Sequence, residues 1–330
     1  MDFKDINIAV VHTGSQDQVL NKTFNSREWE GYLGNAKDIG DVLTKLNFNV
    51  SVIEDGIQII SRLEEIMPDM VWVCSGGIQG RNSAAHLPSI LEMLGIPYIG
   101  SPPLASAIAD DKSYSKIIAD HHGVKTPTYQ VFNSPDDLLK KELEFPLIVK
   151  PNSGLCACGV YKANNIHELQ TYVEVLMSHY HSPVLVESFI PGRDITISVL
   201  ERESDLLVLP PLERFFEWGD STRINEHFTK AHPNSTLSEG SAKSINIGPE
   251  LLKRISQNSC TMFHAIGLRA FCRFDFRLGE DDLYFLEANY KPDLMKNSLF
   301  AKSAALHGIE YQALIKKILN VFHKKQRRET

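Results

Sequence analysis

The stretch that decides the fold runs from Phe271 to Ser298, FCRFDFRLGEDDLYFLEANYKPDLMKNS. Residues 271–276 alternate apolar and polar side chains, and residues 283–289 form a second, more apolar run. Between them, residues 278–282 have the glycine and acidic composition of a turn. This pattern predicts an antiparallel hairpin.

Three oxygen-bearing side chains lie near the ends of the two predicted strands. Glu287 and Asn289 are two residues apart and share one face of their strand, and Asp275 lies near the end of the partner strand. A small set of hard oxygen ligands leaves positions for phosphate oxygens and water, which suits Mg²⁺. The alternative is a hairpin with a solvated acidic face, as surface carboxylates usually have. The surrounding apolar residues, and Arg273 two residues before Asp275, favour the metal site.

Arg-x-Asp, then Glu-x-Asn and a proline, is similar to the metal-binding end of the ATP-grasp carboxylate–amine ligases, in particular of the D-alanine–D-alanine ligase family. The resemblance covers roughly residues 91–320. It implies an ATP-grasp fold of mixed α/β and α+β class, in which an N-terminal α/β domain with a parallel sheet precedes two domains that clamp ATP. We expect these domains at residues 1–101, 102–184 and 185–330.

The composition is that of an ordinary globular protein, with 330 residues, 43% of them hydrophobic and 23% charged. A net charge of −7 argues against a nucleic-acid-binding surface. The N-terminus lacks the apolar region of a signal peptide, and no apolar run approaches the ~18–20 residues that span a bilayer. Five scattered cysteines suit a reducing compartment. We therefore expect a cytoplasmic protein without nucleic-acid or membrane partners.

The first hundred residues alternate between strand and helix patterns, which predicts a parallel sheet covered on both faces. Gly14 follows the first strand, but no G-x-G-x-x-G is present, so dinucleotide binding is disfavoured. The expected strands are 6–11, 50–53 and 70–74, and the expected helices are 35–46 and 61–66.

Two lysines are candidates for the nucleotide phosphates. Residues 91–127 predict a helix, a short strand and, after Ser101-Pro102-Pro103, a helix through Ile118; the family resemblance here implies that Lys112 contacts phosphate. The alternative for Lys112 is an exposed helix lysine. Lys150 ends an apolar strand at 146–151, where an unpaired buried ammonium would be costly, and the resemblance places it on the phosphates.

Residues 152–160 resemble the family's phosphate-covering flap, which acts through backbone N–H groups. The chain keeps Gly154 and Gly159 but has Leu-Cys-Ala-Cys between them, where relatives have small polar residues. A metal pair of Cys156 and Cys158 is disfavoured, because matching Cys or His partners are missing.

Residues 183–199 predict two strands around a Pro-Gly-Arg turn and are similar to the family's adenine and ribose hinge. The resemblance implies that Glu187 meets the adenine amino group and that Asp194 takes the place of the ribose-binding acid. The other nucleotide-binding residues that it implies are Ser188, Phe189, Ile190 and Leu286.

Only some of the family's substrate-binding residues are kept in this chain. The resemblance implies that Arg273 stabilises the transferring phosphoryl group, that Ser298 holds the carboxylate of the amine donor, and that Lys230, in the polar segment 212–247, closes over the site. Asp293 replaces a glycine whose N–H helps form an oxyanion hole in relatives. Cys74 to Gly80 replace the first-substrate motif, and Glu28 and Glu30 are candidates for binding the first amino group.

The resemblance implies an ADP-forming ligase that uses ATP and Mg²⁺. A carboxylate takes the γ-phosphoryl group to give an acyl phosphate, and an amino-acid amine then displaces phosphate. The alternatives are D-alanyl-D-alanine synthesis itself and a non-catalytic ATP-binding homologue, against which the intact Arg273, Asp275, Glu287 and Asn289 speak. The expected partners are small-molecule substrates, and the resemblance is compatible with a homodimer.

Overall fold

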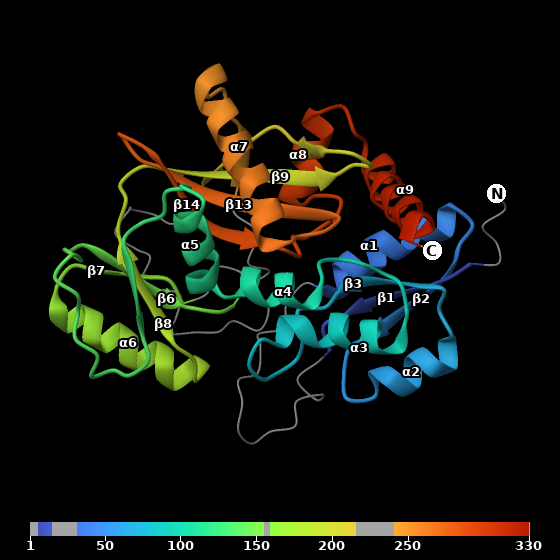
Figure 1. Cartoon of the computed structure of the whole chain (residues 1–330), viewed down its shortest axis with the longest axis horizontal. Helices are drawn as coiled ribbons and strands as arrows, with labels where there is room; N and C mark the ends of the chain where they lie inside the picture. The colour runs from blue at the N-terminus through green and yellow to red at the C-terminus, as the bar shows by residue number, and fades with distance from the viewer. Residues whose placement is uncertain (1–5, 15–31, 155–158, 216–240, 330) are drawn as a thin grey trace.

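The computed structural model describes residues 6–14, 32–154, 159–215 and 241–329. Three sheets, each accompanied by helices, make up this part of the chain (Figure 1). The first lies beside α1, α2 and α3, the second beside α6, and the third beneath α7 and α8, with α4 and α5 between the sheets.

The first sheet is parallel, with strand order β2-β1-β3-β4, as the alternating pattern predicts. Its central strand β3 is buried along its whole length, because helices cover both faces. The strands are β1 (Asn7–His12), β2 (Asn49–Glu54), β3 (Met70–Cys74) and β4 (Tyr98–Ile99), and the helices are α1 (Tyr32–Lys45), α2 (Ile59–Ile66) and α3 (His86–Leu94).

The second sheet has strand order β5-β8-β6-β7 and is antiparallel. One face packs Leu147, Val149 and Val186 against α6. Since side chains alternate along a strand, Lys150 and Glu187 lie on the opposite face, which is the face toward α5. The elements are β5 (Tyr129–Phe132), β6 (Leu147–Pro151), β7 (Tyr161–Ala163), α6 (Ile166–Tyr180) and β8 (Val184–Ser188).

The third sheet contains the predicted hairpin, and its main order is β12-β11-β9-β13-β14, with β10 also paired to β9. The hairpin is antiparallel, as predicted. The elements are β9 (Arg193–Glu201), β10 (Leu206–Val208), β11 (Leu212–Phe215), β12 (Ser241–Ser244), α7 (Gly248–Ile266), β13 (Phe271–Leu278), β14 (Leu283–Asn289), α8 (Leu299–Leu306) and α9 (Tyr311–Glu329).

One expectation about a connection is corrected. The single helix expected after Pro103 is two, α4 (Pro103–Asp110) and α5 (Lys112–His121), because Asp111 has an extended backbone and caps α5 through the N–H of Tyr114. The two strands expected around the Pro-Gly-Arg turn are present as β8 and β9, and they belong to different sheets. Gly192 between them has φ +151°, and a Cβ there would lie 2.0 Å from the carbonyl oxygen of Leu278, so only glycine fits the crossing.

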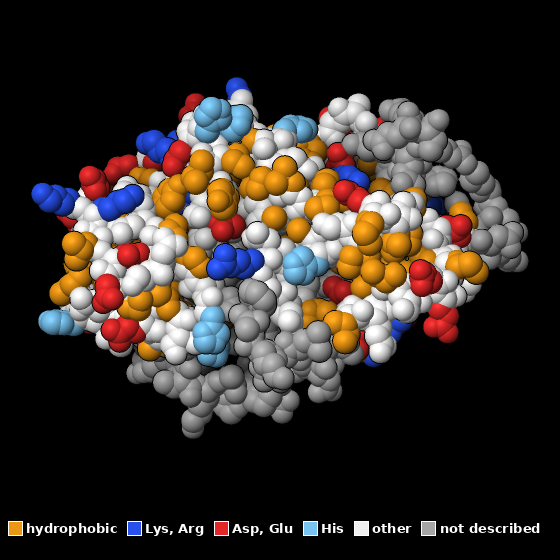
Figure 2. Space-filling view, turned by 60° about the horizontal axis from the view of Figure 1, so that its bottom comes forward, with side chains coloured by type: hydrophobic (Ala, Val, Ile, Leu, Met, Phe, Trp, Pro, Cys, Tyr) orange, Lys and Arg blue, Asp and Glu red, His pale blue; other side chains and the backbone are white. Residues whose placement is uncertain are grey.

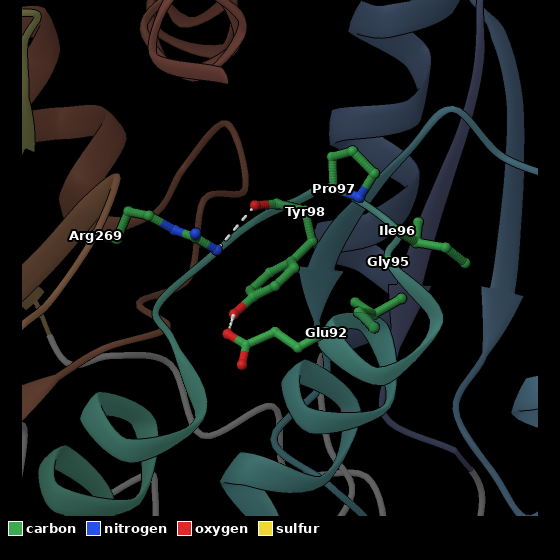
Figure 3. Close-up of a pocket in the computed structure, with 7 residues that line it drawn as sticks. Glu92, Gly95, Ile96, Pro97, Tyr98 and Arg269 are labelled. Carbon is green, nitrogen blue, oxygen red and sulfur yellow. Dashed lines mark hydrogen bonds between the residues drawn. The ribbon is translucent and has the colours of Figure 1, made fainter. Parts of the chain in front are cut away.

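Arg269 joins the first sheet to the third (Figure 3). Its guanidinium lies 4.2 Å from the centre of the Tyr98 ring and donates to the carbonyl oxygens of Tyr98 (3.0 Å) and Gly100 (2.7 Å). Tyr98 in turn donates to Glu92 over 2.8 Å. One hydrophobic core also runs across this joint, from Trp72 of β3 and Phe271 of β13 to α1, α8 and α9. The two sheets are therefore packed as one body.

On the face drawn in Figure 2, acidic and basic side chains are interspersed among small hydrophobic groups. Within the described ranges, no helix is both long enough and apolar enough to span a membrane.

Candidate active site

The predicted oxygen ligands do share one face of the hairpin. Asp275 pairs directly with Glu287, and Arg273 pairs with Asn289. Directly opposite residues of an antiparallel pair point to the same side, so the four side chains form one polar patch. The register shifts just after Asp275, and Leu286 is the extra residue of this β-bulge.

Asp275 lies at the centre of a buried hydrogen-bond network. Thr196 of β9 donates to its Oδ1 over 2.7 Å, and the amide nitrogen of Asn289 lies 3.2 Å from its Oδ2. Arg273 reaches both oxygens, at 3.1 and 3.2 Å, and Arg214 reaches Oδ2 at 3.1 Å. Burial would raise the pKa of Asp275, but Arg273 and Arg214 together lower the pKa to about 2. The carboxylate is therefore ionised at neutral pH.

Glu287 faces the N-terminus of α5. Its Oε2 lies 3.5 Å from Nζ of Lys112, which also donates to the carbonyl oxygen of Gly154 over 3.0 Å. The backbone N–H of Lys112 donates to the carbonyl oxygen of Asn152, and Asp111 forms a β-bridge with Ser153. The first turn of α5 thus ties the start of the flap to the hairpin.

Glu187 stands between two lysines on the face of the second sheet that points to α5. Lys150 of β6 contacts Oε1, and Lys116 of α5 lies 2.8 Å from Oε2. Burial would raise the pKa of Glu187, but Lys116 and Lys150 lower it to about 2. Burial lowers the pKa of Lys116 to about 8, against the attraction of Glu187. The cluster holds one carboxylate and two ammonium groups.

The other predicted hinge residues lie close by. The ring of Phe189 lies 4.1 Å from Nζ of Lys162, and the carbonyl oxygen of Ile190 accepts from Arg277 over 2.9 Å. Asp194 forms a 2.9 Å ion pair with the same Arg277, so its carboxylate is already engaged. Ser188 and Leu286 are half-buried.

In the region predicted to bind the amine donor, Ser298 caps α8. Its hydroxyl accepts from the N–H of Ala301 over 3.2 Å, and the residue is buried. Asp293 accepts from the N–H of Met295 over 2.8 Å, so its carboxylate is turned toward its own loop.

In the region predicted to bind the first substrate, Ser75 follows β3 and donates to the buried Asp55 over 2.5 Å. Thr13, which follows β1, accepts from the N–H of Gly76 over 3.0 Å, and Ser75 accepts from the N–H of Gly77 over 3.0 Å. Burial raises the pKa of Asp55. The carboxyl ends of β1 and β3 therefore carry hydroxyl groups, and that of β2 carries a buried acid, at the edge where parallel sheets bind ligands.

Five predicted residues lie outside the described part of the chain: Glu28, Glu30, Cys156, Cys158 and Lys230.

The described residues fit both Mg²⁺ and a nucleoside triphosphate. Glu287 has a carboxylate that is 28% exposed, and Asn289 turns its amide nitrogen toward Asp275, which directs the amide oxygen away from that carboxylate. Oxygen donors of this kind suit Mg²⁺. Three buried lysines stand near them: Lys112, Lys116 and Lys150. These three lysines contact two carboxylates, Glu187 and Glu287, and the remaining positive charge suits phosphates.

Comparisons with known proteins agree with this geometry. A family model described as D-ala D-ala ligase C-terminus matches residues 118–320. D-alanine–D-alanine ligase of Aquifex aeolicus is 30% identical over 297 residues, which cover 89% of this chain and 96% of that protein. The chain belongs to the D-alanine–D-alanine ligase family.

Two further comparisons cover a similar or larger share of the chain. Uncharacterized protein y4sG of Sinorhizobium fredii is 31% identical over 285 residues, 81% of each chain. The crystal structure of D-alanine–D-alanine ligase from Bacillus anthracis complexed with ATP superposes with a TM-score of 0.79 at 24% identity and covers 98% of this chain and 100% of that one. The ATP-grasp fold expected from the sequence is therefore confirmed.

As a member of the D-alanine–D-alanine ligase family, the chain is an ATP-dependent, ADP-forming ligase that uses Mg²⁺ and small-molecule substrates. Three residues of the polar network were not among the sequence-based candidates: Lys116, Thr196 and Arg214. Lys116 stands four residues after Lys112, a spacing that places both on one helix face, and this is the signal that could have found it. Thr196 and Arg214 come from β9 and β11, and only the register of the sheet brings them to Asp275.

Proposed function

We propose that the protein activates a carboxylate as an acyl phosphate and couples it to the amine of an α-amino acid. The observation that carries this proposal is the single face shared by Arg273, Asp275, Glu287 and Asn289, beside Lys112 and Lys150. When bound, Mg·ATP supplies the phosphoryl group for the activation. Glu287 and Asn289, with the ionised Asp275, would hold the Mg²⁺.

The lysines and the hinge would hold the nucleotide. Lys112 and Lys150 would neutralise phosphate charge, and Glu187 would accept a hydrogen bond from the adenine amino group. Asp194, paired with Arg277, would meet the ribose, and the half-buried residues of the hinge and the bulge would line the base: Ser188, Phe189, Ile190 and Leu286.

Arg273 and Ser298 would act on the reacting groups. The guanidinium of Arg273 is fixed by Asp275, so it is oriented before charge develops, which is how electrostatic stabilisation becomes effective. A hydroxyl can donate as well as accept, so Ser298 can cap α8 and still donate to a carboxylate, and the N-terminus of that helix favours an anion. Both features support an α-amino acid as the amine donor. Lys230 stays a prediction for the closing lysine.

The first substrate is predicted to differ from D-alanine. Cys74 to Gly80 replace the family's first-substrate motif, and around this segment the carboxyl ends of β1, β2 and β3 present Thr13, the buried Asp55 and Ser75. Asp293 adds a carboxylate where relatives have glycine. A buried acid such as Asp55 discriminates by charge at low dielectric, so we expect the usual amino-acid pair to bind poorly here.

The test is a screen of single and paired amino acids for ATP-dependent phosphate release. We expect D-alanine alone to be a poor substrate and a different acid–amine pair to drive release. Robust turnover with D-alanine alone would contradict this prediction and support the second candidate function, D-alanyl-D-alanine synthesis. Mg·ATP binding without turnover for any pair would support a non-catalytic ATP-binding homologue.

We also propose that the protein acts in the cytoplasm without nucleic-acid or membrane partners, and that it forms a homodimer. For the domains we keep the proposed first boundary at residue 101. The pairing of β8 with β5 and β6 supports a second boundary after Ser188 rather than at residue 184.

A further inference from the structure

Helix α5 presents two lysines, one turn apart, to two different parts of the nucleotide site. Lys112 reaches Glu287 and the carbonyl oxygen of Gly154. Lys116 points to Glu187 and also lies 2.6 Å from Oγ1 of Thr126. Because the helix is shared, the positions of the two ammonium groups are coupled.

The two lysines that contact Glu187 differ in their access to solvent. The side chain of Lys150 is 9% exposed, whereas that of Lys116 is 0% exposed. A ligand can therefore contact Lys150 but cannot contact Lys116. Lys116 is also enclosed by the ring of Tyr129, whose centre lies 5.6 Å from its Nζ.

Lys116 is held from the side of the hairpin as well. Thr126, its second partner, donates its hydroxyl hydrogen to the carbonyl oxygen of Phe285 in β14 over 2.9 Å. Phe285 in turn donates its N–H to the carbonyl oxygen of Lys125 over 2.7 Å. A continuous set of contacts thus runs from Glu187 of the second sheet through α5 to the strand that carries Glu287 and Asn289.

We propose that Lys116 is a positioning residue: it is the permanent partner of Glu187, and it thereby leaves Lys150 available to the phosphates of the bound nucleotide. This inference rests on the proposed function, in which Lys150 contacts phosphate. The charges explain the arrangement. One carboxylate that held only one buried lysine would bind it tightly, because separating a buried ion pair leaves an uncompensated charge. With two lysines on Glu187, one can move to phosphate while the other keeps the carboxylate neutralised.

The experiment measures binding of a non-hydrolysable ATP analogue with Mg²⁺, and of adenosine, by calorimetry. In Lys116→Met, Glu187 keeps Lys150, so we expect the analogue to bind ~10-fold or more weakly, about 1.4 kcal/mol. Adenosine, which has no phosphate, should change by less than ~3-fold. Lys253→Met, on the exposed face of α7, is the matched control and should change neither.

A double-mutant cycle separates positioning from a general structural role. If Lys116 acts through Glu187, then adding Lys116→Met to Glu187→Gln should weaken analogue binding by less than ~3-fold relative to Glu187→Gln alone. If Lys116→Met does not fold, Lys116→Gln carries the same expectations. Unchanged analogue binding in Lys116→Met overturns the inference. So does an equal weakening of analogue and adenosine binding that persists when Lys116→Met is combined with Glu187→Gln. Failure of the unmodified protein to bind the analogue overturns the proposed function itself, and this inference with it.

Discussion

Replacement of Glu187 by glutamine should flatten the dependence of stability on acid pH. In the folded protein the two lysines hold the pKa of Glu187 at about 2, against 4.5 for an unperturbed glutamate. The folded pKa is the lower one, so the stabilisation is fully present above pH 4.5 and is lost as the pH falls toward 2. A difference of about 2.5 pKa units corresponds to about 3 kcal/mol in the free energy of unfolding. No discount for solvent screening applies, because the side chain is only 3% exposed.

The assay is urea unfolding at a series of pH values from 6 to 2.5, with the free energy of unfolding extrapolated to water. The unmodified protein should lose about 2–3 kcal/mol more than Glu187→Gln across this range, since part of the stabilisation persists at pH 2.5, above the folded pKa of Glu187. Glu64→Gln, on the exposed face of α2, is the control and should follow the unmodified protein. Parallel curves for the unmodified protein and Glu187→Gln would refute the buried three-group cluster, whatever the difference in absolute stability between them.

Three further predictions concern the metal site, the first-substrate loop and the flap. Asp275→Asn combined with Glu287→Gln should abolish the Mg²⁺-dependent part of ATP binding in calorimetry with and without the metal, and unchanged binding would rule out this site. Gly77→Ala should lower the free energy of unfolding by about 1–3 kcal/mol, since the residue has φ +83° and a Cβ would lie 2.1 Å from the carbonyl oxygen of Ser83. The control is Gly123→Ala, which is also at positive φ but has no atom within 4 Å of its Cβ. An equal loss of stability in both variants would show that the contact with Ser83 has no cost. Cys156→Ser should keep ligase activity within ~10-fold, because the flap is expected to act through its backbone; a fall to background would mean that a thiol takes part in the chemistry.

The hairpin could be predicted because its information is local. Alternation from Phe271 to Phe276, the turn composition that follows and the apolar run up to Asn289 suffice to define two paired strands. Since opposite residues share a face, the convergence of Asp275 and Glu287 followed from the same pattern. The parallel sheet was predictable for a similar reason, because its strands and helices alternate at short intervals.

What the sequence did not reveal depends on contacts between distant segments. Arg214 and Thr196 meet Asp275 only through the order of the third sheet, and no local pattern encodes that order. In the sequence Lys116 resembles an ordinary surface lysine, because its contact with Glu187 depends on how the second sheet packs against α5. The break between α4 and α5 did have a local signal, since Asp111 is a favourable N-cap, but the apolar periodicity on both sides outweighed it.

The most direct test of the central claim, carboxylate activation by phosphoryl transfer, follows an isotope from substrate to phosphate. The acid substrate of the pair with the fastest phosphate release is labelled with ¹⁸O in its carboxylate, and the products are examined by mass spectrometry. Activation as an acyl phosphate predicts one ¹⁸O in the inorganic phosphate for each ADP formed. Label recovered in AMP, or phosphate released without label while the amide forms, would contradict it.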